Sequence, residues 1–89
     1  MKFTITRLCG GKALMVAPNE TFDLDLMKCA DILSKEGFEQ TNIEEGLMLV
    51  MSWKGMEVTI YPQGRIMFYP LAEKNEAVEY ATSILEKVS

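Results

Sequence analysis

The stretch LMLVMSWKGMEVTIYPQGRIMF, residues 47–68, contains two turns between runs of alternating side chains. The dipeptide Lys54-Gly55 predicts a two-residue hairpin loop, which places Trp53 opposite Met56 on one face of a sheet. The tetrapeptide YPQG at 61–64 predicts a second turn, because proline fits its second position and glycine supplies the left-handed backbone at its end. The stretch therefore predicts three consecutive antiparallel strands, at about residues 47–53, 56–61 and 65–70.

These strands sort their side chains onto two faces, because successive residues of a strand point to opposite sides. One face is almost wholly apolar and predicts the core: Leu47, Leu49, Met51, Trp53, Met56, Val58, Ile60, Ile66 and Phe68. The other face is mixed and holds Met48, Val50, Ser52, Glu57, Thr59, Tyr61, Arg65, Met67 and Tyr69. It has more apolar and aromatic groups than contact with water requires, so it is the candidate binding surface.

A helix and a fourth strand are predicted upstream of this stretch. Asp23 predicts the N-cap of a helix over about residues 23–36. Phe22 and Met27 flank the predicted start and are expected to form a hydrophobic staple. The apolar stripe of this helix is Leu26, Cys29, Ala30 and Leu33. A strand at about residues 38–43 then leads into the stretch.

A second helix and an N-terminal hairpin complete the predicted fold. The helix covers about residues 73–88, with an apolar stripe of Ala77, Ala81, Ile84, Leu85 and Val88. Residues 2–8 and 12–17 predict a hairpin with its turn at Gly10-Gly11. Both helices are expected on the apolar face, because their stripes have no other partner. The prediction is a single α+β domain over 1–89: a strand or hairpin, a helix, a four-stranded antiparallel meander and a C-terminal helix, with both helices on one face of one curved sheet.

The composition predicts a globular chain without catalytic or metal chemistry. Hydrophobic residues make up 48% of the 89 residues and charged residues 25%, which is typical of a folded domain. The chain has no histidine, the usual base at neutral pH, and two cysteines alone do not make a zinc site. We therefore expect no enzyme activity, no cofactor and no metal. No apolar run approaches the ~20 residues that span a bilayer, so we expect no membrane contact and a cytoplasmic location.

The net charge and the two cysteines indicate which partners to expect and whether the thiols are oxidised. The net charge of −4 disfavours attraction to a phosphate backbone. Cys9 and Cys29 are expected to be free thiols, with Cys29 in the core, because cytosolic proteins rarely carry disulfides. The pair Glu44-Glu45 is interpreted as solvated turn charge rather than as half of a carboxylate site.

From Phe22 onward the chain resembles one repeat of the TATA-box-binding protein family. The resemblance rests on FDLDLMK at 22–28, GLMLV at 46–50, VTIYPQGRIMFY at 58–69 and EAVEYA at 76–81. In that family two repeats join their first strands into a saddle, and its concave sheet binds the DNA minor groove with phenylalanines wedged between base steps. The resemblance therefore implies half of such a saddle, in a small archaeal protein.

Site residues follow from this resemblance position by position. It implies that Tyr61 occupies one wedge position and that Glu44 or Glu45 lies near the other. It also implies that the concave face holds Thr59, Met67 and Tyr69. Strand 2–8 would then pair where a second repeat joins in the family, and would either cap the sheet there or mediate pairing of two copies.

These observations leave two candidate functions. The preferred hypothesis is a non-enzymatic binding module that uses the mixed face for a protein partner or for self-association as a homodimer. The residues expected to make the contact are Tyr61, Tyr69, Met67, Arg65, Thr59 and Met48. The alternative is a transcription-related domain that binds nucleic acid on the same face, with Tyr61 and Tyr69 stacking on bases. A small-molecule pocket between sheet and helices has no convergent polar groups in its favour.

Overall fold

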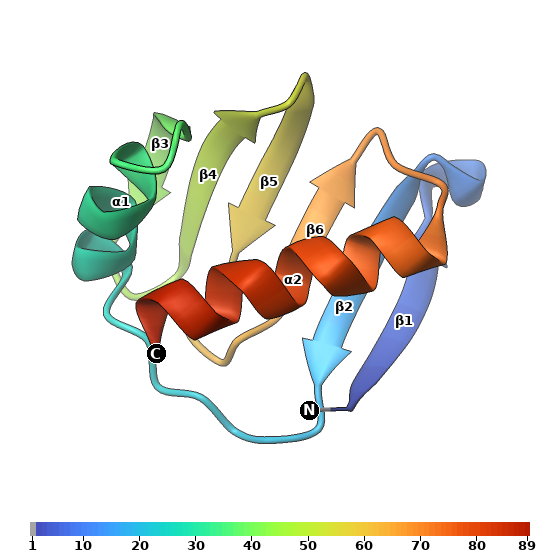
Figure 1. The fold of residues 1–89 in the computed structure, drawn as a ribbon, viewed down its shortest axis with the longest axis horizontal. Helices are drawn as coiled ribbons and strands as arrows, with labels where there is room; N and C mark the ends of the chain where they lie inside the picture. Colours follow the sequence, from blue (N-terminus) through green and yellow to red (C-terminus); the bar gives the residue numbers. More distant parts are fainter. Residues whose placement is uncertain (1) are drawn as a thin grey trace.

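The computed structural model describes residues 2–89, and in this range the chain forms one six-stranded antiparallel sheet with two α-helices (Figure 1). The strand order across the sheet is β1-β2-β6-β5-β4-β3. In chain order the elements are β1 (Phe3–Leu8), a short turn η1 (Cys9–Gly11), β2 (Ala13–Pro18), α1 (Leu26–Ser34), β3 (Glu39–Glu44), β4 (Met48–Trp53), β5 (Met56–Ile60), β6 (Ile66–Tyr69) and α2 (Lys74–Val88). The α+β class and the antiparallel sheet are confirmed.

The N-terminal hairpin is part of the main sheet. β2 pairs with β6, with Leu14 opposite Phe68 and Val16 opposite Ile66. Leu14 and Val16 are fully buried, because β2 lies between two neighbouring strands and under α2. The sheet therefore has six strands rather than the four of the predicted meander. The four predicted strands are present as β3 to β6, and the β2–β6 pairing extends them.

Both predicted turns of the 47–68 stretch are confirmed. The two-residue loop places Trp53 opposite Met56 across β4 and β5. The 61–64 turn closes when the N–H of Gly64 donates to the carbonyl of Tyr61 at 2.9 Å. Gly64 has a φ of +101°, the left-handed conformation expected of it. These turns fix the alternation of side chains from β4 to β6.

One face of the sheet is covered by both helices. α2 runs across the strands, and α1 lies beside β3 and β4 and contacts α2 (Figure 1). The buried side chains of the helices are Leu26, Cys29, Ala30 and Leu33 from α1, and Ala77, Ala81, Ile84 and Leu85 from α2. The shared covered face and both apolar stripes are confirmed.

Aromatic side chains join the sheet to α2. The ring of Trp53 stacks on Phe38 with a centroid distance of 4.4 Å, and Tyr80 of α2 meets it edge-on at 4.9 Å. Stacked and edge-to-face pairs are favourable beyond the area they bury. Tyr80 lies outside the predicted stripe of α2, so this cluster is a feature that the pattern of α2 did not predict.

The start of α1 differs from the prediction. Asp25, not Asp23, is the N-cap, and its carboxylate accepts hydrogen bonds from two backbone N–H groups of the first turn at 3.1 and 3.3 Å. Met27 is 56% exposed, so its predicted hydrophobic staple with Phe22 is wrong. The predicted helix over 23–36 is accordingly shortened to Leu26–Ser34.

Tertiary hydrogen bonds explain the late start of α1. The backbone N–H groups of Phe22 and Leu24 donate to carbonyls of the 61–64 turn, at 3.3 and 2.9 Å. These bonds hold residues 22–24 extended along the end of the sheet. A helix that began at Asp23 would need helical backbone at Leu24 in place of the extended backbone that these bonds hold.

Leu47 is a second correction to the predicted core. Its side chain is 62% exposed, and its N–H donates to the carbonyl of Glu44 at 2.8 Å. Leu47 therefore belongs to the turn between β3 and β4, and β4 begins at Met48. The remaining predicted core positions of the stretch lie on the covered face and are buried or, for Trp53, half-buried.

Candidate functional site

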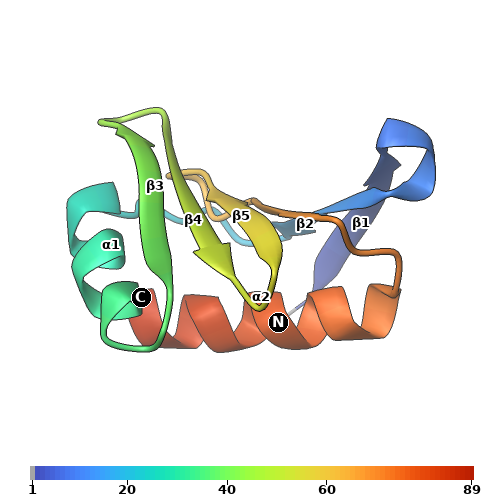
Figure 2. The same ribbon diagram turned by 90° about the horizontal axis from the view of Figure 1, so that it is seen from above.

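The face of the sheet opposite α1 and α2 carries no helix in the described part of the chain, and we call it the open face. Figure 2 shows α2 along one side of the sheet, while the turn between β3 and β4 and the turn between β1 and β2 rise toward the other side, at opposite ends of the sheet. The sheet is therefore strongly twisted, and the open face is concave along the line that joins these two turns. A concave face offers contact from its floor and from both raised ends.

A row of side chains crosses the floor of the open face from strand to strand. The register places Val50 opposite Thr59, Thr59 opposite Met67, and Met67 opposite Met15. Directly opposed side chains share a face, so these four residues form one line, which we call the central row. The row continues onto the edge strands with the polar residues Asn42 and Thr6.

The central row is partly shielded from water although no described helix lies over it. Thr59 is only 3% exposed, and Val50, Met67 and Met15 are half-buried. Thr59 lies between Val50 and Met67 in the register, so a side chain from each neighbouring strand shields it. Water therefore reaches only part of the side-chain surface of the central row.

The predicted contact residues all lie on this face but are not one cluster. Thr59 and Met67 belong to the central row. Met48 is half-buried and stands opposite Glu44 on β3. Tyr69 is 42% exposed and stands opposite Glu57 on β5. Met48 and Tyr69 therefore flank the central row on its two sides.

Tyr61 and Arg65 form a pair at one end of the open face. The guanidinium carbon of Arg65 lies 4.9 Å from the centroid of the Tyr61 ring, within the range of a cation–π contact. The N–H of Tyr61 donates to the carbonyl of Arg65 at 2.9 Å, which continues the β5–β6 ladder into the turn. The ladder and the cation–π contact hold the ring and the charge together, as the alternation predicted.

Carboxylates are prominent on the open face. Glu39 and Glu57 both stand opposite Ser52, on its two sides, and Glu44 stands at the far end of β3. All three glutamates are exposed. They place negative charge around the central row, and Arg65 adds a positive charge beside Tyr61 at the 61–64 turn.

The hairpin contributes residues to this face that the sequence analysis did not assign to it. They are Met15, Ala17, Thr4 and Thr6, which follow from the β1–β2 and β2–β6 registers. A signal was present: β2 reads ALMVAP, with consecutive apolar residues and no alternation. A short continuous apolar run is consistent with a strand in the interior of a sheet, and β2 is paired on both sides.

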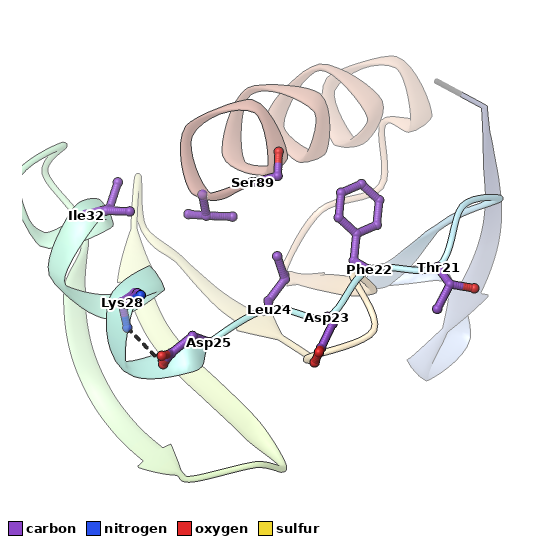
Figure 3. Close-up of a pocket in the computed structure, with 9 residues that line it drawn as sticks. Thr21, Phe22, Asp23, Leu24, Asp25, Lys28, Ile32 and Ser89 are labelled. Atoms are coloured by element: carbon purple, nitrogen blue, oxygen red, sulfur yellow. Dashed lines mark hydrogen bonds between the residues drawn. The ribbon is translucent and has the colours of Figure 1, made fainter.

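A separate pocket of about 430 Å³ lies between the segment before α1 and the end of α2 (Figure 3). Phe22 and Leu24 point toward α2, and Asp23 points the opposite way. The carboxylate of Asp25 is already engaged as the N-cap of α1. The pocket therefore has apolar walls and no convergent set of free polar groups, and we do not assign it a ligand.

The two thiols differ sharply in environment. Cys9 is exposed in η1, whereas Cys29 is 1% exposed in the core, as predicted. Burial, with a smaller effect of the Asp25 charge, raises the pKa of the Cys29 thiol from 9.0 to about 11. Because the folded state favours the neutral thiol, this contribution to stability is complete below pH 9 and is lost as the pH rises toward 11.

We expect alkylation to distinguish these thiols. At pH 8 a thiol reagent should add once to the native protein, at Cys9, and twice to the protein in denaturant, because only a thiolate that reaches solvent reacts. Mass spectrometry measures the number of adducts. The control Cys9→Ser should take up none under native conditions, and rapid double addition to the native chain would contradict the burial of Cys29.

Within residues 2–89 no group of three or more histidine, cysteine or acidic side chains is arranged to hold a metal ion. Neither described helix is long and apolar enough to cross a membrane. A scan against protein-family models and searches of curated proteins and of solved structures found no match. The open face is therefore the candidate site on its geometry and chemistry alone.

Proposed function

We propose that this chain is a non-enzymatic binding module whose open face holds an amphipathic helix of a protein partner. The observation that carries the proposal is the central row, in which three apolar side chains and Thr59 cross four strands on a face that no helix of the described chain covers. Val50, Met67 and Met15 are half-buried, so part of their surface stays open to a partner, and contiguous apolar surface of this kind marks interaction sites.

The shape of the open face favours a convex occupant. A helix with its side chains is about 10 Å across and presents a convex apolar stripe. Two copies placed face to face would meet first at their raised turns, which would leave water between their central rows. Shape therefore favours a helix over the same face of a second copy.

The side chains around the central row suggest how such a helix would be anchored. Tyr69 and the Tyr61–Arg65 pair are of the residue types that dominate binding energy at interfaces. The exposed carboxylates of Glu44 and Glu57 would attract basic residues beside the apolar stripe. The expected partner is thus a helix with an apolar stripe and lysine or arginine flanks.

Charge makes nucleic acid the less favoured occupant of the same face. The chain carries a net charge of −4, and Glu39, Glu44 and Glu57 lie on the open face itself. Phosphate contacts supply most of the affinity of nucleic-acid binding. Oligonucleotides are therefore the alternative ligand to try in the binding experiment below.

The methionine methyl groups can test the helix-binding proposal, because some lie on the open face and others lie in the core or on α1. Met15, Met48 and Met67 lie on the open face, Met51 and Met56 in the core, and Met27 on the exposed side of α1. We expect a synthetic amphipathic peptide with a leucine stripe and lysine flanks to shift the methyl NMR signals of the first three and to leave that of Met27 unchanged. A peptide with the same stripe and glutamate flanks should bind more weakly.

Variants sharpen this measurement. Tyr69→Ala should weaken peptide binding by about tenfold, because it removes a large anchor. Met27→Ala, which removes an exposed apolar side chain away from the open face, should leave binding unchanged. No shift with either peptide, or shifts with low-salt DNA or RNA probes alone, would overturn the helix-binding proposal.

A further inference from the structure

The two edges of the sheet are protected to different degrees. At the β3 edge the register shifts between Gln40 and Asn42, and exposed glutamates stand at both ends of the strand, Glu39 and Glu44. Bulges and charges of this kind prevent edge-to-edge pairing. The β1 edge is less protected: its six residues pair with β2 without a shift and include no acidic residue and no proline, and the guanidinium of its one charged residue, Arg7, donates to the carbonyl of Ala72 at 3.3 Å.

The hydrogen-bonding groups on the outer side of β1 can be assigned. The N–H of Asn19 donates to the carbonyl of Lys2 at 2.9 Å, which extends the β1–β2 ladder by one pair. In an antiparallel ladder the residues that bond to the neighbour alternate. Thr4, Thr6 and Leu8 therefore bond to β2, and the backbone groups of Phe3, Ile5 and Arg7 point outward.

These outward groups are available for another strand. Phe3, Ile5 and Arg7 form no backbone hydrogen bond with a turn or loop in the described part of the chain. Phe3 and Ile5 are also only half-buried, and their side chains lie at the margin of the core. A strand added here would complete the ladder and cover this apolar margin.

We propose that β1 pairs antiparallel with β1 of a second copy, about a two-fold axis at Ile5, to give one continuous sheet of both copies. In this register Ile5 faces Ile5, Phe3 faces Arg7, and Thr4 faces Thr6 of the other copy. Each of the three outward residues then exchanges both of its backbone hydrogen bonds, six in all by this count. Axes at Thr4 or Thr6 would use only two of the three.

The side-chain order of β1 suits its own reversed copy. The central pair is aliphatic, the aromatic ring of Phe3 meets the cation of Arg7, and threonine meets threonine, all pairings that stabilise sheets. An axis at Arg7 would instead oppose two like charges. Self-complementarity of this kind is what a two-fold interface requires.

The proposed pairing has a consequence for the open face but does not rest on the function proposed for it. A two-fold axis perpendicular to the sheet keeps both pairs of helices on one side and both open faces on the other. The dimer would offer two binding faces side by side. A partner with two helices would then gain affinity from simultaneous binding.

A charge exchange at two exposed threonines tests both the pairing and its register. Thr4→Lys with Thr6→Lys would oppose lysines across the two-fold axis, whereas Thr4→Lys with Thr6→Glu would oppose lysine and glutamate. Both positions are exposed and on the open face, so both double variants should fold. We expect the wild type and the lysine–glutamate variant to show twice the 10.1 kDa chain mass in sedimentation equilibrium.

The double-lysine variant should show a dissociation constant raised by about tenfold or more, because like charges face each other twice. Amide exchange provides a second readout: Phe3, Ile5 and Arg7 should exchange more slowly in the wild-type dimer than in this variant. A wild type that is monomeric at every concentration, or two double variants that dimerise equally or fail equally, would overturn the proposal. The methionine shifts on the open face would be unaffected by that failure.

Discussion

Replacing Phe68 with alanine should lower the free energy of unfolding by about 3–5 kcal/mol. Phe68 is fully buried in β6, between Leu14 of β2 and Val58 of β5, and its ring lies 6.0 Å from that of Tyr80 in α2. Deleting the ring removes its burial and leaves a cavity where the sheet meets α2. Domains of this size have stabilities of about 4–13 kcal/mol, so much of the total would be lost.

Neighbouring variants make this prediction specific. Urea unfolding of Phe68→Leu, which keeps much of the volume, should show a loss of about 1–2 kcal/mol. Tyr69→Ala should cost less than about 1 kcal/mol, because Tyr69 is 42% exposed on the opposite face. Similar losses for the alanine variants at 68 and 69 would mean that the two faces of β6 are assigned wrongly.

The two faces of the meander were predictable because they follow from local information. The turns at Lys54-Gly55 and 61–64 fix the register within a few residues, and alternation does the rest. Alternation alone can, however, assign a residue next to a turn to the wrong environment. Leu47 continues the alternation in the sequence, but the chain has not yet entered β4 at that point, and its side chain is exposed.

Contacts between distant segments were not predictable in the same way. The β2–β6 pairing joins residues far apart in the chain, and only the unbroken apolar run of β2 hinted at a central strand. The start of α1 depends on hydrogen bonds from Phe22 and Leu24 to the 61–64 turn. The sequence pattern predicted Asp23 as the cap, whereas the extended segment held by these bonds places the cap at Asp25.

In the candidate site, too, some features follow from the local sequence and others depend on contacts between distant segments. The predicted contact residues lie on the open face because alternation places them there. The burial of Thr59 between Val50 and Met67, and the addition of Met15 beside Met67, come from the pairing and width of the whole sheet. The residue types of the site could therefore be predicted from the sequence, whereas its shape became known only from the six-stranded structure.

Gly64→Ala is expected to lower the free energy of unfolding by about 2–4 kcal/mol, from two separate causes. Gly64 has a φ of +101°, which an L-residue adopts only at a cost. A β-carbon at this position would also lie 2.7 Å from Cδ1 of Phe22 and 3.0 Å from Cγ of Pro18. The turn closes against the segment that leads from the hairpin to α1, and a methyl group would force them apart.

Gly46→Ala is the matched control that separates these causes. Gly46 also has a left-handed φ, +81°, but a β-carbon there would meet nothing within 4 Å. It should therefore show only the conformational cost, about 1 kcal/mol. If denaturant titration finds equal losses for the two variants, Phe22 and Pro18 do not pack against the 61–64 turn. A larger loss at Gly64 would show that this contact ties the hairpin segment to the meander, because the backbone conformation is left-handed at both glycines and only the contact differs.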